Sequence, residues 1–216
     1  MFHNPPQPSL TLREGSWRLV YKISMIDSKL VMQLREQTGA GVLEAKKALE
    51  ETNGDIEKAT EFLRKSGALK AAKKSDRATN EGLVHAYIHG GGKVGVLVEL
   101  LCETDFVARN PAFEELAHDV ALQIAATNPL YVKPEDVPAQ TVEKEKSMYA
   151  EEVVGKPANI VEKIVQGKLD KWYSDVCLMR QTFIKDEDMT IEDVVKAKIS
   201  MLGENIQVRR FVRYGL

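Results

Sequence analysis

Two runs of alternating apolar residues, separated by three consecutive glycines, constrain the fold of this chain more than any other feature. Residues 84–88 carry apolar side chains at every second position, and residues 94–100 repeat the pattern. A period of two is typical of β-strands that bury one face. Gly90-Gly91-Gly92 lies between the runs, and glycine readily adopts the backbone conformations of a tight turn. The sequence therefore predicts an antiparallel β-hairpin.

The segment before this hairpin has helical spacing instead. Apolar residues recur three and four positions apart in three stretches, which stop at Thr38-Gly39, Asn53-Gly54 and Ser66-Gly67. Asp55 can cap the third helix. We predict a three-helix bundle of the ubiquitin-associated type over residues 25–68, small enough to be marginally stable alone. The basic stretch 69–80 is predicted to be a linker.

The rest of the chain is predicted to be mostly helical. Asn110-Pro111 can begin a helix, and Asn128-Pro129 can end it. Two more helices are expected around residues 142–152 and 157–172, the second burying Ile160 and the apolar residues that follow it. Thr190 and Gly203 bracket the last helix, and a final strand should place Ile206, Val208 and Val212 on one face. Residues 81–216, which follow the N-terminal bundle in the sequence, are predicted to form an antiparallel sheet packed with helices. The predicted fold class is therefore α+β.

Composition excludes several classes of protein. The chain has 30 basic and 32 acidic side chains and a net charge of −2, which argues against a general nucleic-acid surface. No apolar run approaches the roughly 18 residues of a membrane span. Two cysteines are too few for a disulfide framework and favour a reducing compartment.

The first 24 residues differ from the rest. They contain three prolines and one acidic residue, Glu14, without the continuous apolar stretch of a secretory signal. We expect a disordered extension, or a start assigned too early with Met25 as the true start. An organellar transit peptide is the alternative.

No catalytic or cofactor motif is present. Gly90-Gly91-Gly92-Lys93 is too short for a phosphate-binding loop, so we expect no bound nucleotide and no cofactor. His85 and His89 would lie about 13 Å apart on one strand face, too far to share a metal ion unaided. We expect neither a metal site nor enzymatic activity.

Two segments resemble the signatures of the elongation factor Ts family, the nucleotide-exchange factors of bacterial and organellar translation. They are Thr38-Gly39-Ala40-Gly41-Val42-Leu43-Glu44-Ala45-Lys46-Lys47-Ala48-Leu49 and Cys102-Glu103-Thr104-Asp105-Phe106-Val107-Ala108-Arg109-Asn110. Further blocks are similar at residues 65–74, Gly155-Lys156-Pro157, Gly203-Glu204-Asn205-Ile206 and Arg209-Arg210-Phe211. The resemblance runs from about Met25 to Tyr214.

The resemblance implies a guanine-nucleotide exchange factor that binds elongation factor Tu carrying GDP. The residues that it assigns to the contact with this partner are Val42, Leu43, Thr104, Asp105, Phe106, Gln123, Phe183 and Ile184. Asp105 and Phe106 align with an acid and an aromatic that intrude near the partner's Mg²⁺ site. Gln123 stands where many members have His, and Thr182 where they usually have Pro.

Other interpretations of these residues stay open. Val42 and Leu43 could be core of the bundle, and Phe106 could fold back onto its own sheet. Arg109 and Asn110 are expected to form a local ion pair and a helix cap.

The family also suggests a quaternary state and a compartment. Many members carry a second sheet-and-helix unit and a protruding coiled coil, whereas this chain has a single unit. The resemblance therefore implies a homodimer, in the cytoplasm. The competing functions are a binding module or adaptor without exchange activity, which would use the bundle, and a small enzyme with a spatially assembled site.

Overall fold

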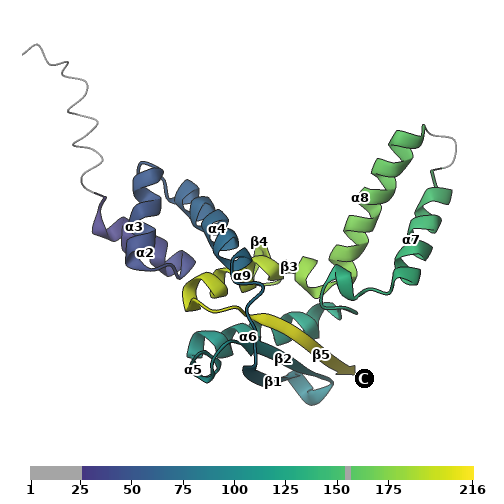
Figure 1. The fold of residues 1–216 in the computed structure, drawn as a ribbon. Helices are drawn as coiled ribbons and strands as arrows, with labels where there is room; N and C mark the ends of the chain where they lie inside the picture. Colours follow the sequence, from purple (N-terminus) through teal and green to yellow (C-terminus); the bar gives the residue numbers. More distant parts are fainter. Residues whose placement is uncertain (1–25, 154–156) are drawn as a thin grey trace, which may run out of the picture. The chain divides into compact units, whose positions relative to one another are not determined.

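The computed structural model describes residues 26–153 and 157–216. They belong to two compact units that divide between Leu63 and Arg64 (Figure 1). The expected extension over residues 1–24 and the first two residues of the block Gly155-Lys156-Pro157 lie outside the described residues. No helix in the described ranges is both long enough and apolar enough to cross a membrane.

The first unit is made of three helices, α2 (Ser28–Thr38), α3 (Val42–Glu51) and the beginning of α4 (Ile56–Ala72). The Asp27 carboxylate accepts a hydrogen bond from the Lys29 N–H at 2.9 Å, and Gly39 ends α2 at φ 66°. Asp55 caps α4 by accepting from the Lys58 N–H at 3.1 Å, as predicted. The buried core of this unit consists of Val31, Leu34, Ala45, Ala48, Leu49 and Ala59.

Helix α4 is longer than predicted. The sequence suggested an end at Ser66-Gly67, but the helix continues to Ala72. Gly67 lies next to Ser200 of α9 (Ile191–Leu202), and Ala71 is part of the core of the second unit. Packing against α9 therefore offsets the roughly 1 kcal/mol that a glycine costs inside a helix.

The predicted hairpin is present and forms two of the three strands of the main sheet in the second unit. Strand β1 (Glu81–His89) pairs antiparallel with β2 (Val94–Cys102), and the turn between them is a short 3₁₀ segment, η1 (Gly90–Gly92). Strand β5 (Gln207–Gly215) pairs antiparallel with the other edge of β2. The sheet order is thus β1-β2-β5.

A bulge in β5 changes which residues face the core. Leu100 pairs with Val208 and Glu99 pairs with Arg210, so Arg209 is the extra residue. Val208 is buried, but the bulge reverses the alternation after it. Phe211 then packs against the core while Val212 is exposed, so the prediction that Val208 and Val212 share a face was wrong. The cause is a two-to-one pairing that periodicity alone does not reveal.

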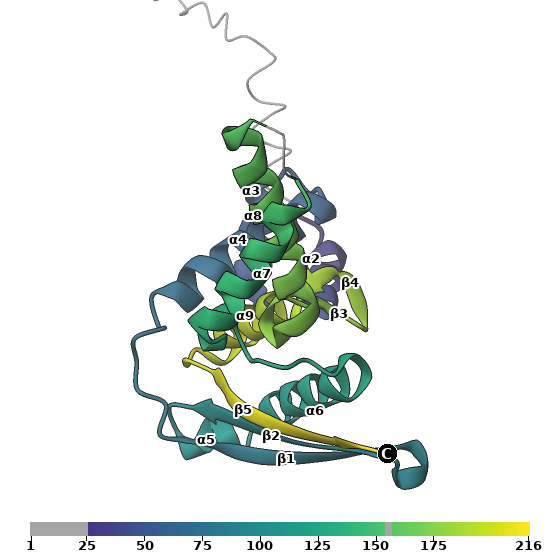
Figure 2. The same cartoon turned by 90° about the vertical axis from the view of Figure 1, so that its right-hand side faces the viewer.

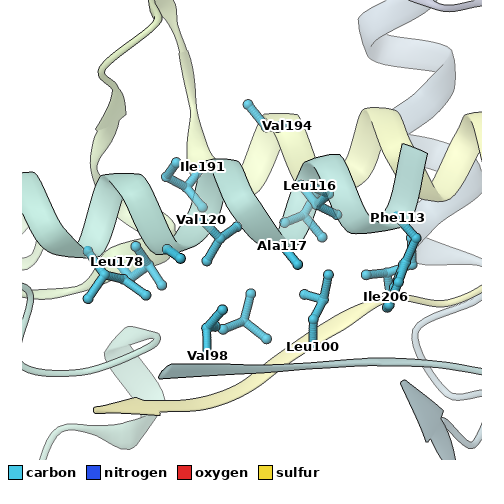
Figure 3. Close-up of a cluster of buried hydrophobic side chains, with 14 of the residues drawn as sticks. Val98, Leu100, Phe113, Leu116, Ala117, Val120, Leu178, Ile191, Val194 and Ile206 are labelled. Atoms are coloured by element: carbon cyan, nitrogen blue, oxygen red, sulfur yellow. The ribbon is translucent and has the colours of Figure 1, made fainter. Parts of the chain in front are cut away.

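Helix α6 (Pro111–Thr127) covers one face of this sheet (Figure 2). Asn110 caps it by accepting from the Ala112 N–H at 2.9 Å, and Asn128 ends it, as predicted. Its apolar stripe packs on the inward side chains of β2, including Val98 and Leu100 (Figure 3). The residues of this stripe are Phe113, Leu116, Ala117, Val120, Ala121 and Ile124. Leu178, Ile191 and Ile206 extend the same cluster.

The remaining elements lie before and after α6. They are α5 (Asp105–Ala108), which precedes it, then η2 (Pro134–Asp136), α7 (Ala139–Glu151), α8 (Ala158–Val176), η3 (Leu178–Arg180), β3 (Thr182–Phe183) and β4 (Asp186–Thr190). Helices α7 and α8 form a helical hairpin (Figure 1). Along α8 only Leu169 is fully buried among the residues described, and Ile160 is exposed, contrary to prediction. In the described part of the chain, α7 is the helix that packs along α8, and it leaves Ile160 exposed.

The α+β class is therefore confirmed: helices pack with a small antiparallel sheet. Thr190 begins α9 with a capping box, and Gly203 ends it at φ 79°, as predicted. The likeness of the first unit to a ubiquitin-associated bundle stays a prediction.

Candidate functional site

The turn between β2 and α6 presents an exposed aromatic ring. Thr104 caps the short helix α5, and its Oγ1 accepts from the Val107 N–H at 3.4 Å. Val107 is buried and anchors the turn, whereas Phe106 is 79% exposed. The interpretation that Phe106 folds back onto its own sheet is therefore wrong. Asp105 beside it is exposed and forms an ion pair with Arg109 at 3.1 Å.

A second carboxylate, Glu204, lies under this turn. Its Oε2 accepts from the N–H groups of Glu103 and Thr104 at 3.1 and 3.0 Å, and its Oε1 accepts from the Thr104 hydroxyl at 2.6 Å. Sequence reasoning did not assign Glu204 a role, although it belongs to the block Gly203-Glu204-Asn205-Ile206. Its partners are about one hundred residues away in the chain, so no local signal could have identified it.

Cys102 is buried beneath the same turn. Its Sγ donates to the Thr104 carbonyl oxygen at 3.2 Å. Burial, and then the nearby Glu204 carboxylate, raise the pKa of this thiol to about 11. A thiol so rarely ionised is a poor nucleophile, which makes Cys102 part of the support of the turn.

Val42 and Leu43 lie on the first unit, at the start of α3. Leu43 is 82% exposed, and Val42 is also exposed. Neither belongs to the buried core of the bundle, so the alternative that they are core residues is wrong. An adjacent pair of exposed branched aliphatic side chains is a surface that can bind a partner.

The remaining candidates gather where α6 meets β3. Gln123 is fully buried, and its Nε2 donates to the Thr182 carbonyl at 3.1 Å and to Gln181 Oε1 at 3.2 Å. Its Oε1 accepts from the Ile184 N–H at 3.0 Å. Phe183 is 7% exposed and belongs to the core, while Ile184 is 42% exposed.

The structure thus brings the candidates together in three places. Thr104, Asp105 and Phe106 share the turn after β2, and Gln123 lies with Phe183 and Ile184 at β3. Val42 and Leu43 belong to the other unit. Gln123 and Phe183 present almost no side-chain surface, so a direct contact with a partner at this place would fall to Ile184.

Other titratable residues form a small group between β1 and α6. His85 Nε2 lies 3.4 Å from His118 Nδ1. Burial and the neighbouring His118 lower the pKa of His85, and Glu114 opposes this shift. Within residues 26–153 and 157–216 no group of three or more His, Cys, Asp or Glu could hold a metal ion. A shallow groove between α7 and α8, lined by residues such as Lys146 and Val161, has no buried titratable group.

Comparison with known proteins identifies the family of this chain. The family model described as "Elongation factor TS" matches residues 29–216. Elongation factor Ts of Carboxydothermus hydrogenoformans is 54% identical over 194 residues, which is 89% of each chain. That of Thermotoga maritima is 54% identical over 189 residues (88% of this chain, 95% of the relative), and that of Coprothermobacter proteolyticus is 55% identical over 193 residues (88% and 98%). The chain therefore belongs to the elongation factor Ts family.

Proposed function

We propose that this protein is a guanine-nucleotide exchange factor that binds elongation factor Tu carrying GDP and promotes GDP release. The observation that carries the proposal is the Phe106 side chain, which is 79% exposed on a short, anchored turn beside the exposed Asp105. Phe106 enters between helices of the partner, and Asp105 disturbs the contacts of the partner's Mg²⁺. The phosphate-binding loop of the partner then moves away from GDP.

A phenylalanine is suited to this task. Its ring offers a large apolar surface with two rotatable bonds, so little conformational entropy is lost when it is buried. An acid next to it can accept backbone N–H groups or compete for the surroundings of a cation.

The energetics require additional contacts. Weakening GDP binding about 10⁴-fold needs about 5.5 kcal/mol of coupling. Burying one Phe contributes roughly 1.5–3 kcal/mol. The rest has to come from surfaces that grip the partner at the same time, and reciprocity requires GDP to weaken the complex by the same factor.

Two exposed apolar sites supply these gripping surfaces in our proposal. Val42 and Leu43 contact the GTP-binding domain of the partner, and Ile184 contacts its C-terminal barrel domain. Gln123 and Phe183, which are buried, act by fixing the backbone of the Ile184 turn.

A homodimer is the second part of the proposal. The face of the sheet opposite α6 carries five exposed apolar side chains, Val84, Ile88, Leu97, Val212 and Tyr214. We refer to them as the outer face. A face of this kind on a two-layer unit is a candidate for pairing with a second copy across a twofold axis. Leu97→Glu should then shift the protein from dimer to monomer in analytical ultracentrifugation, and a monomeric parent would contradict the dimer. The cytoplasm is the compartment that we expect.

The test of exchange is stopped-flow release of a fluorescent GDP analogue from elongation factor Tu. The parent protein should accelerate release strongly, and Phe106→Ala should lose most of that acceleration while its circular dichroism spectrum and Tm remain those of the parent. Leu130→Ala, which removes another exposed apolar side chain of the second unit, is the matched control and should remain active.

The alternative function is a binding module without exchange activity. It would appear as a stable complex with elongation factor Tu in which GDP release is not accelerated. Full activity of a folded Phe106→Ala variant would retain the exchange function but refute the role of the ring.

A further inference from the structure

We propose that Glu204 is a positioning residue for nucleotide exchange: its carboxylate fixes the Phe106 turn in the inserting conformation before the partner arrives. The inference rests on the exchange function proposed above. Glu204 lies in the short link between α9 and β5, and it touches the base of the turn rather than Phe106 itself.

The contact satisfies the turn at three atoms. Two consecutive backbone N–H groups, of Glu103 and Thr104, point at one oxygen of Glu204, and the Thr104 hydroxyl donates to the other. The same hydroxyl accepts from the Val107 N–H inside α5. The carboxylate therefore holds Glu103 and Thr104, which precede Asp105 and Phe106, and it reaches Val107 through the Thr104 hydroxyl. Charge-assisted hydrogen bonds are the stronger kind.

Glu204 is itself held in place by a reciprocal contact. The Glu103 carboxylate accepts from the Asn205 N–H at 2.6 Å and lies 3.5 Å from Arg77 Nη1. The buried Asn205 side chain donates to the carbonyl oxygens of Ser75 and Arg77 at 3.2 and 2.9 Å. The Glu103 carboxylate thus binds the segment that carries Glu204, and the Glu204 carboxylate binds the segment that carries Glu103. This double contact leaves neither segment free to move alone.

Order in the free protein matters for a ring that must enter a partner. Each backbone residue that has to be ordered on binding lowers the affinity by about tenfold. A turn fixed in advance avoids that loss for the residues next to Phe106. Glu204 should therefore affect the rate of GDP release through Phe106 and not through any contact of its own.

The variants can separate positioning from general stability. Glu204→Ala removes the acceptor, whereas Glu204→Gln keeps an oxygen for the two N–H groups and an amide that can donate to the Thr104 hydroxyl. Thr104→Val removes only the hydroxyl, and it replaces Glu204→Ala in the measurements if that variant does not fold. Asp193→Ala is the matched control, because Asp193 also accepts from a backbone N–H and a hydroxyl, those of Thr190 at 3.2 and 2.8 Å. It lies at the opposite end of α9.

The first measurement is amide hydrogen exchange of the free protein, which does not depend on the function. Glu204→Ala should raise the exchange rates of the Glu103 and Thr104 amides about tenfold. Glu204→Gln should stay within about threefold of the parent, and Asp193→Ala should leave both amides unchanged. Unchanged protection in Glu204→Ala would overturn the proposal whatever the exchange assay shows.

The second measurement is accelerated GDP release from elongation factor Tu. Glu204→Ala should lower the acceleration about tenfold, Glu204→Gln should restore it, and Asp193→Ala should not affect it. In the Phe106→Ala background, Glu204→Ala should cause no further loss, because positioning requires the ring. A full additional loss in that background would refute the proposal. No acceleration by the parent would refute the exchange function, and positioning for exchange with it, while the amide rates would still report whether Glu204 orders the turn.

Discussion

Phe106 and Phe183 both lie in segments that the resemblance assigned to the partner, yet the structure treats them in opposite ways. Phe106 is 79% exposed, while Phe183 is 7% exposed and packs in the core of the second unit. The Glu204 carboxylate accepts hydrogen bonds from the base of the Phe106 turn, and the ring itself stays exposed. At β3 the buried Phe183 ring and the Gln123 amide hold the backbone, and the neighbouring Ile184 side chain is exposed. An aromatic residue in a contact loop can therefore be either the contact or its support.

The largest effect that distinguishes the two rings concerns stability. Phe183→Ala should lower the free energy of unfolding by about 3–5 kcal/mol, because it leaves a cavity in the core. Phe106→Ala should change it by less than about 0.5 kcal/mol. Urea denaturation followed by circular dichroism measures both, and similar values for the two variants would contradict the comparison.

The buried amide gives the next effect. Gln123→Leu should destabilise the second unit by about 2–3 kcal/mol, because the Ile184 N–H and the Thr182 carbonyl lose their buried partner. Gln166→Leu, at an exposed glutamine of α8, is the control and should be nearly neutral. A neutral Gln123→Leu would show that the Ile184 turn does not depend on this amide.

Ile184 should show the reverse of Phe183. Ile184→Ala should weaken binding to elongation factor Tu by about fivefold to thirtyfold without lowering Tm, since it removes exposed apolar surface from the proposed contact. Ile160→Ala is a close control, because Ile160 is 43% exposed against 42% for Ile184 and lies on α8. Isothermal titration calorimetry would detect the difference, and equal affinities for both variants would place the contact elsewhere.

The smallest effect concerns the two cysteines near these turns. Cys102 and Cys177 are both fully buried, and burial raises the pKa of each thiol to about 11. Both should react slowly with a disulfide reagent at pH 8. Thr104→Ala should accelerate labelling of Cys102 by about fivefold by loosening the turn above it, and should leave Cys177 unchanged. Equal acceleration at both sites would indicate general unfolding instead.

Local signals in the sequence predicted much of the fold. The hairpin at Gly90–Gly92, the caps Asp55 and Asn110, and the capping box of α9 depend on residues a few positions apart. The same holds for the α+β class. Features that depend on distant partners were missed. Helix α4 passes through Gly67 because α9 lies beside it, and no property of residues 66–67 reveals that neighbour.

The candidate site shows the same difference between features with local signals and features that depend on distant residues. Exposed positions such as Leu43 and Phe106 could be proposed from the resemblance, but whether a side chain faces solvent depends on the completed core. Gln123 was placed among the contacts, and its burial follows from groups at positions 181–184. Glu204 was not proposed at all, because its partners come from the other end of the core.

The bulge at Arg209 determines which side of the sheet each later residue of β5 faces, because it adds one residue to the strand. Beyond it Phe211 faces α6, and Val212 and Tyr214 join the outer face. Deleting that one residue would leave Arg210 opposite Glu99 and Phe211 opposite Val98 in a regular ladder, so each later side chain would keep its side. Pairing every residue after Val208 without a bulge would instead turn each later side chain to the opposite side. The outer face should therefore tolerate deletion of Arg209, because the pairs beyond the bulge do not depend on that residue.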